Sequence, residues 1–207
     1  LREILKYSNI ESIVLVDLDP AMTRLFSSAS LLRRLNGDAF ASPKVKVVNA
    51  DAARWLEEAD ESFDFIVADF PDPTSHSIGK LYSTGFYRLL EKRLTPRGWL
   101  VVQATSPYYA RRSFWTVVAT LEAVGLRTAP YHALVPSFGE WGYIIAGRQP
   151  YAPPDRYTVP LRFLTPEGTA VLFDFPADMA RVDMPPNRLD DQPLVRVFES
   201  EWRHVMH

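Results

Sequence analysis

Short apolar runs alternate with amphipathic stretches through the first 150 residues of the chain. The runs at 12–16, 44–50, 63–68 and 99–104 are brief and rich in β-branched residues, as buried parallel strands are. Between them, apolar residues recur at intervals of three and four, which is the period of an amphipathic helix. The alternation predicts an α/β domain with a mostly parallel sheet.

The helix expected after the first strand has clear start signals. Asp19 fits an N-cap and Pro20 fits the first helical position. The apolar period then continues to about Leu35, where Asn36 and Gly37 interrupt it. One helix is therefore predicted from Pro20 to about Leu35.

The second half of the alternating region predicts a helix, a turn and a hairpin. Thr84 is the expected N-cap of a helix that runs to about Leu94, and residues 96–98 (Pro-Arg-Gly) are the expected turn into the next strand. The runs 126–135 and 141–147 are separated by turn residues, so they predict an antiparallel hairpin that closes the sheet.

The alternation stops after Gly147, and proline becomes frequent. We expect residues 150–207 to form an extended appendage that packs on the domain formed by residues 1–149. Two short helices are predicted within the appendage, near 166–173 and 194–203.

Composition excludes several classes of protein. The 207 residues are 47% hydrophobic, which is enough for one domain with a core of its own. Lys and Arg total 23 against 25 Asp and Glu, with no basic block, so a nucleic-acid partner is not expected. There is no cysteine, and the four histidines are scattered, so no metal site is expected. No apolar run approaches the roughly 20 residues that span a bilayer.

Carboxylates stand at the ends of three predicted strands, at Asp17, Asp51 and Asp69. In open parallel sheets, ligands bind outside the carboxyl ends of the strands. Asp17 suits a ribose diol, because Asp19 already serves as the helix cap. Asp51 could accept a hydrogen bond from an adenine amine, but it also fits the N-cap of the helix that follows, so both interpretations stay open. Together the strand ends predict an adenosine site.

A second carboxylate, Asp72, follows Asp69 in a loop that contains Pro71 and Pro73. The two acids could receive a cationic amine, with one taking its proton and the other holding charge further along the substrate. The alternative is a solvated acidic loop with no binding role.

Five segments resemble the catalytic domain of the polyamine aminopropyltransferases, the spermidine synthase family. They are LREILKYSNIESIVLVDLD, VNADAARWL, FDFIVADFPDPTS, LYSTGFYRLLEKRLTPRGWLVVQ and VPSFGEWGYIIAG, in this order. The resemblance implies the Rossmann-like fold of S-adenosylmethionine-dependent methyltransferases. It also implies aminopropyl transfer from decarboxylated S-adenosylmethionine, as co-substrate, to a polyamine such as putrescine, without a metal or a covalently bound cofactor.

The resemblance assigns a role to each candidate residue. On the donor side, Asp17 matches the ribose-binding acid, and Asp51 with Ala52 matches the adenine contact. On the acceptor side, Asp69 matches the general base and Asp72 a polyamine-binding acid. Gln103 and Phe138 match positions that line the acceptor site. The resemblance further implies a homo-oligomer.

The chain also departs from the family pattern. The Gly-rich turn and the strand before it would precede Leu1, so we expect the natural protein to extend upstream and the domain as given to be incomplete. The two strands beside that missing strand would then face each other across about 10 Å and could not pair. Residues 74–77 (Thr-Ser-His-Ser) replace a usual Gly-Pro, and Phe138 replaces a frequent Tyr. The acceptor therefore need not be putrescine.

The appendage resembles bacterial spermidine synthase-like proteins that carry membrane helices upstream. That resemblance implies the cytoplasmic domain of an inner-membrane protein. Two other functions remain open on the sequence alone. One is an amine methyltransferase of the same fold, and the other is a non-catalytic domain that binds a nucleoside or a polyamine.

Overall fold

The structure is a computed structural model in which residues 1–203 are described. The chain divides into two compact units. Unit 1 comprises Leu1–Ala59 with Arg156–Phe163, and unit 2 comprises Asp60–Asp155 with Leu164–His207. The predicted division at residue 149 does not coincide with these units, and it stays a prediction.

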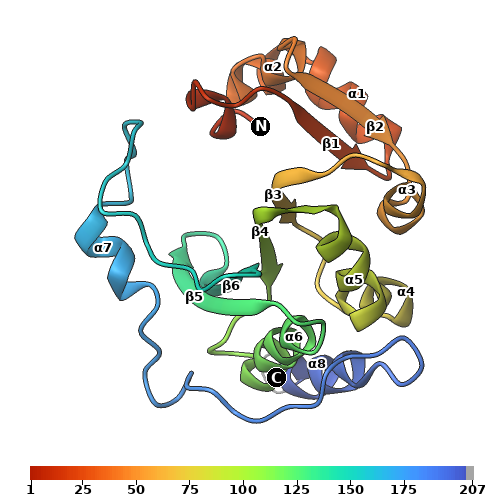
Figure 1. Cartoon of the computed structure of the whole chain (residues 1–207), viewed down its shortest axis with the longest axis vertical. Helices are drawn as coiled ribbons and strands as arrows, with labels where there is room; N and C mark the ends of the chain where they lie inside the picture. Colours follow the sequence, from red (N-terminus) through yellow and green to blue (C-terminus); the bar gives the residue numbers. More distant parts are fainter. Residues whose placement is uncertain (204–207) are drawn as a thin grey trace. The chain divides into compact units, whose positions relative to one another are not determined.

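Unit 1 contains a two-stranded parallel sheet and short helices. Strand β1 (Ile13–Asp17) pairs with β2 (Val45–Asn49), in a register that sets Asp17 opposite Asn49. The helical elements of the unit are η1 (Ile4–Lys6), α1 (Pro20–Ser28), α2 (Ser30–Asn36), η2 (Ala39–Ala41) and α3 (Ala52–Glu58). Figure 1 labels the strands and the α-helices.

The single helix predicted after β1 is wrong, because Ala29 divides it into α1 and α2. Ala29 has φ −67° and ψ 123°, which is extended backbone. The hydroxyls of Ser27 and Ser28 both donate to the carbonyl of Arg24, at 3.0 and 2.7 Å. Such hydroxyls compete with the helix ladder for backbone acceptors, which favours a break. The predicted start is confirmed, since the Asp19 carboxylate accepts from the amide of Ala21 at 2.7 Å.

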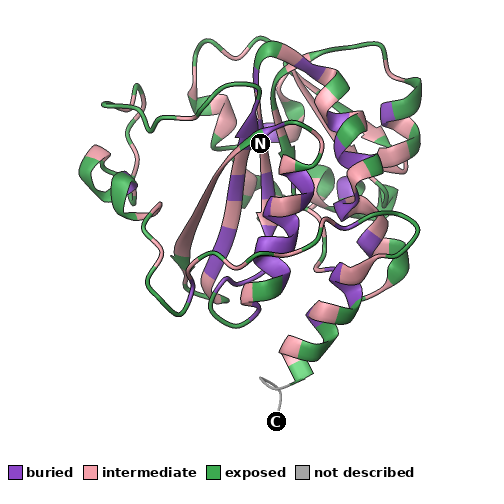
Figure 2. Ribbon diagram, turned by 60° about the horizontal axis from the view of Figure 1, so that its bottom comes forward, coloured by how far each residue is buried: buried purple, intermediate pink, exposed green. Residues whose placement is uncertain are grey.

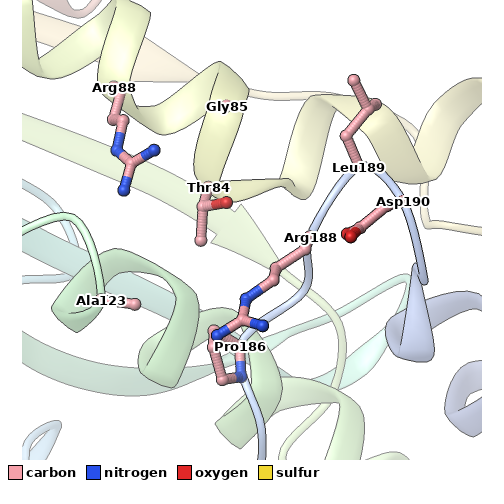
Figure 3. A pocket seen from close by; sticks show the side chains of 8 residues that line it. All are labelled: Thr84, Gly85, Arg88, Ala123, Pro186, Arg188, Leu189 and Asp190. Atoms are coloured by element: carbon pink, nitrogen blue, oxygen red, sulfur yellow. The ribbon is translucent and has the colours of Figure 1, made fainter.

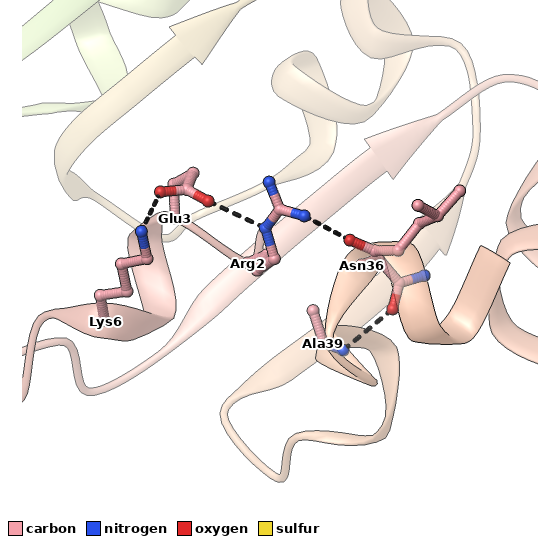
Figure 4. Close-up of polar contacts among 6 residues, drawn as sticks. Arg2, Glu3, Lys6, Asn36 and Ala39 are labelled. Atoms are coloured by element: carbon pink, nitrogen blue, oxygen red, sulfur yellow. Dashed lines mark hydrogen bonds and ion pairs between the residues drawn. The ribbon is translucent and has the colours of Figure 1, made fainter. Parts of the chain in front are cut away.

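Polar contacts connect the start of the chain to the end of α2 (Figure 4). Arg2 donates to the Glu3 carboxylate at 2.8 Å and to the carbonyl of Leu35. The Asn36 side chain accepts from the amide of Ala39 at 3.2 Å. The side chains of Arg2 and Glu3 are 57% and 59% exposed, so their ion pair contributes at most about 1 kcal/mol.

Unit 2 contains a four-stranded mixed sheet in the order β3-β4-β6-β5. Strands β3 (Phe63–Ala68) and β4 (Leu94–Ala104) are parallel, and β6 (Gly139–Gly147) is antiparallel to both β4 and β5 (Arg127–Val135). The closing hairpin is confirmed. The turn predicted at 96–98 is wrong, because these residues lie within β4, where the register with β3 shifts between Phe63 and Phe65. An irregularity of that kind accommodates extra residues without ending a strand.

Unit 2 also contains helices, which are α4 (His76–Gly79), η3 (Lys80–Tyr82), α5 (Thr84–Arg93), α6 (Arg111–Glu122), α7 (Pro166–Val171) and α8 (Pro193–Arg203). Of these, α5 and α6 pack against the sheet, and α8 packs against α6. The two helices predicted in the appendage are confirmed as α7 and α8, whereas α4 and η3 were not predicted. The N-cap of α5 is Ser83 rather than Thr84, because the Ser83 hydroxyl accepts from the amide of Phe86 at 3.3 Å.

The core of unit 2 lies between its sheet and α6, where buried residues concentrate (Figure 2). Phe114 of α6 and Leu100 and Ile144 of the sheet are fully buried. A Cβ on Gly142 would lie 2.5 Å from the Phe114 ring, so only glycine permits this close approach. The packing holds β4 and β6 rigidly, and with them the strand ends where the predicted site residues lie.

Strands β1 and β3 belong to different sheets. The kinds of strand pairing match the predicted fold class, because two parallel pairs are followed along the chain by an antiparallel hairpin.

Candidate active site

Asp17 is the last residue of β1, in unit 1. One of its carboxylate oxygens accepts from the amide of Asp19 at 2.7 Å, and its carbonyl accepts from the Asn49 side chain at 3.2 Å. Within residues 1–203, the second carboxylate oxygen makes no hydrogen bond. The local turn therefore orients the carboxylate and leaves one oxygen for a ligand.

Asp51 follows the neighbouring strand β2 and is the N-cap of α3. Its Oδ1 accepts from the amides of Ala53 and Arg54 at 2.9 and 3.1 Å, which confirms the capping interpretation. Ala52 is the first residue of α3. Because β1 and β2 are parallel, Asp17 and Asp51 lie beyond the same edge of the unit 1 sheet, as the predicted adenosine site requires.

Residues 69–75 of unit 2, which we call the acidic loop, connect β3 to α4. Asp69 directly follows β3 and is exposed, whereas Asp72 is half-buried. The Oδ1 atom of Asp72 is buried and has no hydrogen-bond partner among the described residues. Burial raises the pKa of Asp72 to about 6, from an ordinary value of 3.8. The loop thus holds a carboxyl group that has no cationic partner within residues 1–203.

Two tyrosines experience the charge of these carboxylates. Burial, and then the charges of Asp72 and Asp69, raise the pKa of Tyr82. Burial, and then the charge of Asp69, raise the pKa of Tyr143. Asp69 therefore lies close enough to act on both phenols, and Asp72 on one. Neither tyrosine stands at a strand end, so the strand-end pattern in the sequence did not point to them.

Gln103 lies beside Asp69 in the sheet register. Ala68 pairs with Val102, so the next residues, Asp69 and Gln103, occupy the same level at the carboxyl ends of β3 and β4. Gln103 in turn pairs with Tyr143 of β6. Its Nε2 donates to the carbonyl of Ala104 at 3.3 Å, and its Oε1 is a second buried oxygen without a partner in the described chain. Strands in a sheet are about 4.8 Å apart, so Asp69, Gln103 and Tyr143 form a row of neighbouring polar groups.

Phe138 lies in the turn between β5 and β6. Its side chain is 62% exposed, and its ring lies 5.3 Å from that of Trp141. The contacts of Phe138 are thus to its own hairpin, and its role in binding an acceptor stays a prediction.

The candidate residues divide between the two units. Asp17, Asp51 and Ala52 belong to unit 1, and the four acceptor-side residues belong to unit 2. Asp17 and Asp51 lie at the carboxyl ends of the parallel strands β1 and β2, and Asp69 and Gln103 lie at those of β3 and β4. Asp72 lies in the acidic loop and Phe138 in the β5–β6 turn. That the two sets line one cleft stays a prediction.

A cavity of about 380 Å³ in unit 2 lies between α5 and the C-terminal segment (Figure 3). Thr84 and Arg88 of α5 line it on one side, and Pro186 and Arg188 on the other. None of the predicted site residues is among the described residues that line this cavity. We therefore place the candidate site at the strand ends and not in the cavity.

Neither a group of metal ligands nor a membrane-spanning helix occurs within residues 1–203. Over that range, no three His, Asp or Glu side chains are placed to hold a metal ion together. His204 and His207 lie outside the described residues. None of the helices formed by the same residues has the length and apolar character needed to cross a bilayer.

Most of the chain matches the model of one protein family. Residues 1–156 match the model of the spermine/spermidine synthase domain. The chain belongs to the spermine/spermidine synthase family. The family resemblance inferred from the five segments is therefore confirmed.

Curated members of this family are similar to the chain over its whole length. Polyamine aminopropyltransferase 2 of Ralstonia nicotianae is 56% identical, in a match that covers 100% of the chain and 41% of that protein. The polyamine aminopropyltransferase of Leptospira interrogans is 45% identical, with the same two coverages. The chain thus spans about two fifths of the length of these relatives.

Solved structures of spermidine synthases share the fold. The crystal structure of the enzyme from Thermotoga maritima has a TM-score of 0.73 at 22% identity, covering 84% of this chain and 61% of that one. A spermidine synthase in complex with the transition state analogue AdoDATO has a TM-score of 0.74 at 23% identity, covering 84% and 62%. These matches confirm the predicted Rossmann-like fold of the spermine/spermidine synthase family.

The raised pKa of Asp72 makes the stability of the domain depend on pH. The folded form binds a proton on Asp72 more tightly than the unfolded chain, so the contribution of this group to stability is fully present below pH 3.8 and is lost as pH rises through about 6. The shift corresponds to about 3 kcal/mol, which solvent screening of this half-buried group reduces to about 1–2 kcal/mol.

We expect Asp72→Asn to remove the loss of stability that accompanies ionisation of Asp72, since asparagine does not titrate. Urea unfolding at pH 4.5 and pH 7.5 measures the change in unfolding free energy for each protein. Asp64→Asn, an exposed change on β3, is the control and should behave as wild type. An equal pH dependence in wild type and Asp72→Asn would contradict the assignment.

Proposed function

We propose that this domain transfers an aminopropyl group from decarboxylated S-adenosylmethionine to a polyamine such as putrescine. The observation that carries the proposal is the buried Oδ1 of Asp72 in the acidic loop, which has no hydrogen-bond partner among the described residues. The charges of Asp72 and Asp69 both act on the same phenol, that of Tyr82. A buried carboxylate oxygen without a donor is costly, and a bound ammonium group supplies both a donor and a compensating charge.

The proposed chemistry assigns separate tasks to the two acids. A primary amine has a pKa near 10, so at neutral pH it arrives protonated and cannot act as a nucleophile. Asp72 holds the amine through charge-assisted hydrogen bonds, and Asp69 accepts its proton. The freed nitrogen lone pair attacks the methylene next to the sulfonium. A C–N bond forms, the C–S bond breaks, and its electron pair remains on sulfur in the leaving 5′-methylthioadenosine.

The row of polar groups beside Asp69 supports this assignment. Gln103 offers a buried carbonyl oxygen that has no donor among residues 1–203, and Tyr143 stands next to it in β6. An ammonium or amine group placed there would find an acceptor within one strand spacing of the proposed base. Rigid strands position Asp69, which favours an aligned approach of the nitrogen.

The donor half of the proposal rests on unit 1. The free carboxylate oxygen of Asp17 can accept from a ribose hydroxyl, and Asp51 and Ala52 stand at the start of α3, where an adenine amine could be bound. The relatives are polyamine aminopropyltransferases, which supports the same reaction. Because the chain spans about two fifths of their length, the activity of the whole protein remains part of the proposal.

Calorimetry of the full-length protein tests the function. We expect decarboxylated S-adenosylmethionine and 5′-methylthioadenosine to bind at least about tenfold more tightly than S-adenosylmethionine, a difference of about 1.4 kcal/mol. Preference for S-adenosylmethionine itself would favour an amine methyltransferase. Absence of binding by all three compounds would favour a domain without transferase activity.

The proposed location of the domain in the cell rests on the resemblance of residues 150–207 to bacterial relatives that carry membrane helices. On that basis we propose a cytoplasmic domain of an inner-membrane protein that assembles as a homo-oligomer.

A further inference from the structure

The acidic loop has little backbone structure of its own. Its residues, 69–75, are all described and form neither helix nor strand. Pro71 and Pro73 have no amide hydrogen to donate. Within the loop, the amide of Thr74 donates to the carbonyl of Asp72 at 2.7 Å. The position of Asp72 therefore depends on contacts from other elements.

Tyr82 of η3 supplies such a contact to the backbone of the loop. Its side chain is 1% exposed, and its hydroxyl oxygen lies 3.1 Å from the carbonyls of both Phe70 and Pro71. The single hydroxyl proton can donate to either carbonyl. Burial, and then the charges of Asp72 and Asp69, raise the pKa of Tyr82, which favours the protonated phenol that donates this bond. The two acceptors lie between Asp69 and Asp72 in the chain.

Asn187, in the segment before α8, forms a hydrogen bond with the backbone of Tyr82. It is fully buried, and its Nδ2 donates to the carbonyls of Tyr82 and Gly79, at 3.2 and 3.0 Å. Its Oδ1 accepts from the amide of Leu194 at 3.2 Å. Its backbone amide donates to the hydroxyl of Thr120 at 2.9 Å. The asparagine thus ties η3 to α6 and to the start of α8.

Close packing reinforces the same junction. A Cβ on Gly79 would lie 2.6 Å from both the Gln192 and the Val195 side chains. The turn that carries Tyr82 therefore has no free space on the side of the C-terminal segment.

We propose that Tyr82 is a positioning residue for the acceptor amine, and that Asn187 connects the C-terminal segment to it. The inference rests on the proposed function and names residues that the family resemblance did not assign. Tyr82 fixes the Phe70–Pro71 backbone, and through it the place of Asp72. Asp69 is held separately, because it follows directly on the β3–β4 ladder at Ala68.

Because Asp72 and Asp69 are held by different contacts, the proposal predicts which kinetic constant changes when the Tyr82 hydroxyl is removed. Removing the Tyr82 hydroxyl frees Asp72, which holds the acceptor, and leaves Asp69, the proposed base, on its strand. Acceptor binding should weaken while the chemical step at saturating amine is largely kept. A loss of general stability alone would not separate the two constants in this way.

Tyr82→Phe in the full-length protein tests the proposal, with Tyr87→Phe as the matched control. Tyr87 is also fully buried, but its hydroxyl has no hydrogen-bond partner in the described part of the chain. At saturating donor, we expect Tyr82→Phe to raise the acceptor KM about tenfold, as for one lost buried hydrogen bond, with kcat within about twofold of wild type. Tyr87→Phe should change neither constant.

Amide hydrogen exchange gives a second readout that needs no activity. In Tyr82→Phe, the amide of Thr74, which donates to the Asp72 carbonyl, should exchange at least about tenfold faster than in wild type and in Tyr87→Phe. Unchanged exchange in Tyr82→Phe would overturn the proposal, as would an unchanged acceptor KM in an active enzyme. If the wild-type protein uses no amine at all, the proposed function fails, and the exchange rates still decide whether Tyr82 positions the loop.

Discussion

Asp69→Asn should lower kcat by about 100-fold or more while leaving amine and donor affinities within about threefold of wild type. Asparagine has nearly the shape of aspartate and still accepts hydrogen bonds, but it cannot take a proton from an ammonium group. The variant therefore separates proton transfer from binding. Steady-state kinetics at saturating donor and calorimetry with the amine together measure the two effects.

The control for this change is Asp64→Asn, on the same strand. Asp64 is exposed, and its carboxylate accepts from the Thr95 hydroxyl at 2.9 Å, an interaction that asparagine can keep. Its kcat should match wild type. A small effect at Asp69, of less than about fivefold, would mean that water or another group takes the proton, and the assigned mechanism would be wrong.

Asp72→Asn is expected to raise the acceptor KM by about 10- to 100-fold, because it removes a charge-assisted hydrogen bond worth about 1.5–3 kcal/mol. Donor affinity should not change, since the donor-side candidates belong to unit 1. The effect should exceed that of Tyr82→Phe, which displaces the carboxylate without removing it. Kinetics with the amine varied at saturating donor provide the measurement.

Asp190→Asn is a suitable control for Asp72→Asn. Asp190 is exposed and lines the cavity between α5 and the C-terminal segment. We expect its acceptor KM to equal that of wild type. If instead Asp190→Asn weakened acceptor binding and Asp72→Asn did not, the cavity would be the better candidate for the amine site.

The two acids differ in the way the fold supports them, and this difference matches the proposed division of labour. A base must be aligned closely with the reacting nitrogen, and Asp69 follows a strand of a packed sheet. An anchoring group can tolerate more movement, and Asp72 lies in a loop held through a tyrosine hydroxyl. Tertiary contacts of the C-terminal segment thus reach the acceptor side of the site through Tyr82 and Asn187.

Much of the candidate site could be predicted from local sequence. The apolar runs located the strands, and the acids that follow them, Asp17, Asp51 and Asp69, lie at strand ends as expected. Asp19 and Pro20 marked the start of α1 correctly, because caps and first-turn prolines act within a few residues. The segments quoted for the family resemblance were long enough to identify the family.

Local errors arose where side chains compete with the backbone. The seryl hydroxyls that accompany the break at Ala29 have no effect on hydrophobic periodicity, so one helix was predicted where there are two. Ser83 and Thr84 are both suitable caps, and propensity alone does not choose between adjacent hydroxyl residues. The short elements α4 and η3 were hidden in a polar segment without a helical period.

What the sequence determined by itself was the order of strands and helices and the acids at the strand ends, because these depend on residues within a few positions of one another. Only the tertiary structure decided how Asp72 is held and why its carboxyl group keeps a proton to higher pH. The contact between Asn187 and Tyr82 spans 105 positions of the chain. Burial and hydrogen bonds across such separations arise only when the chain packs, so no local pattern could have indicated them.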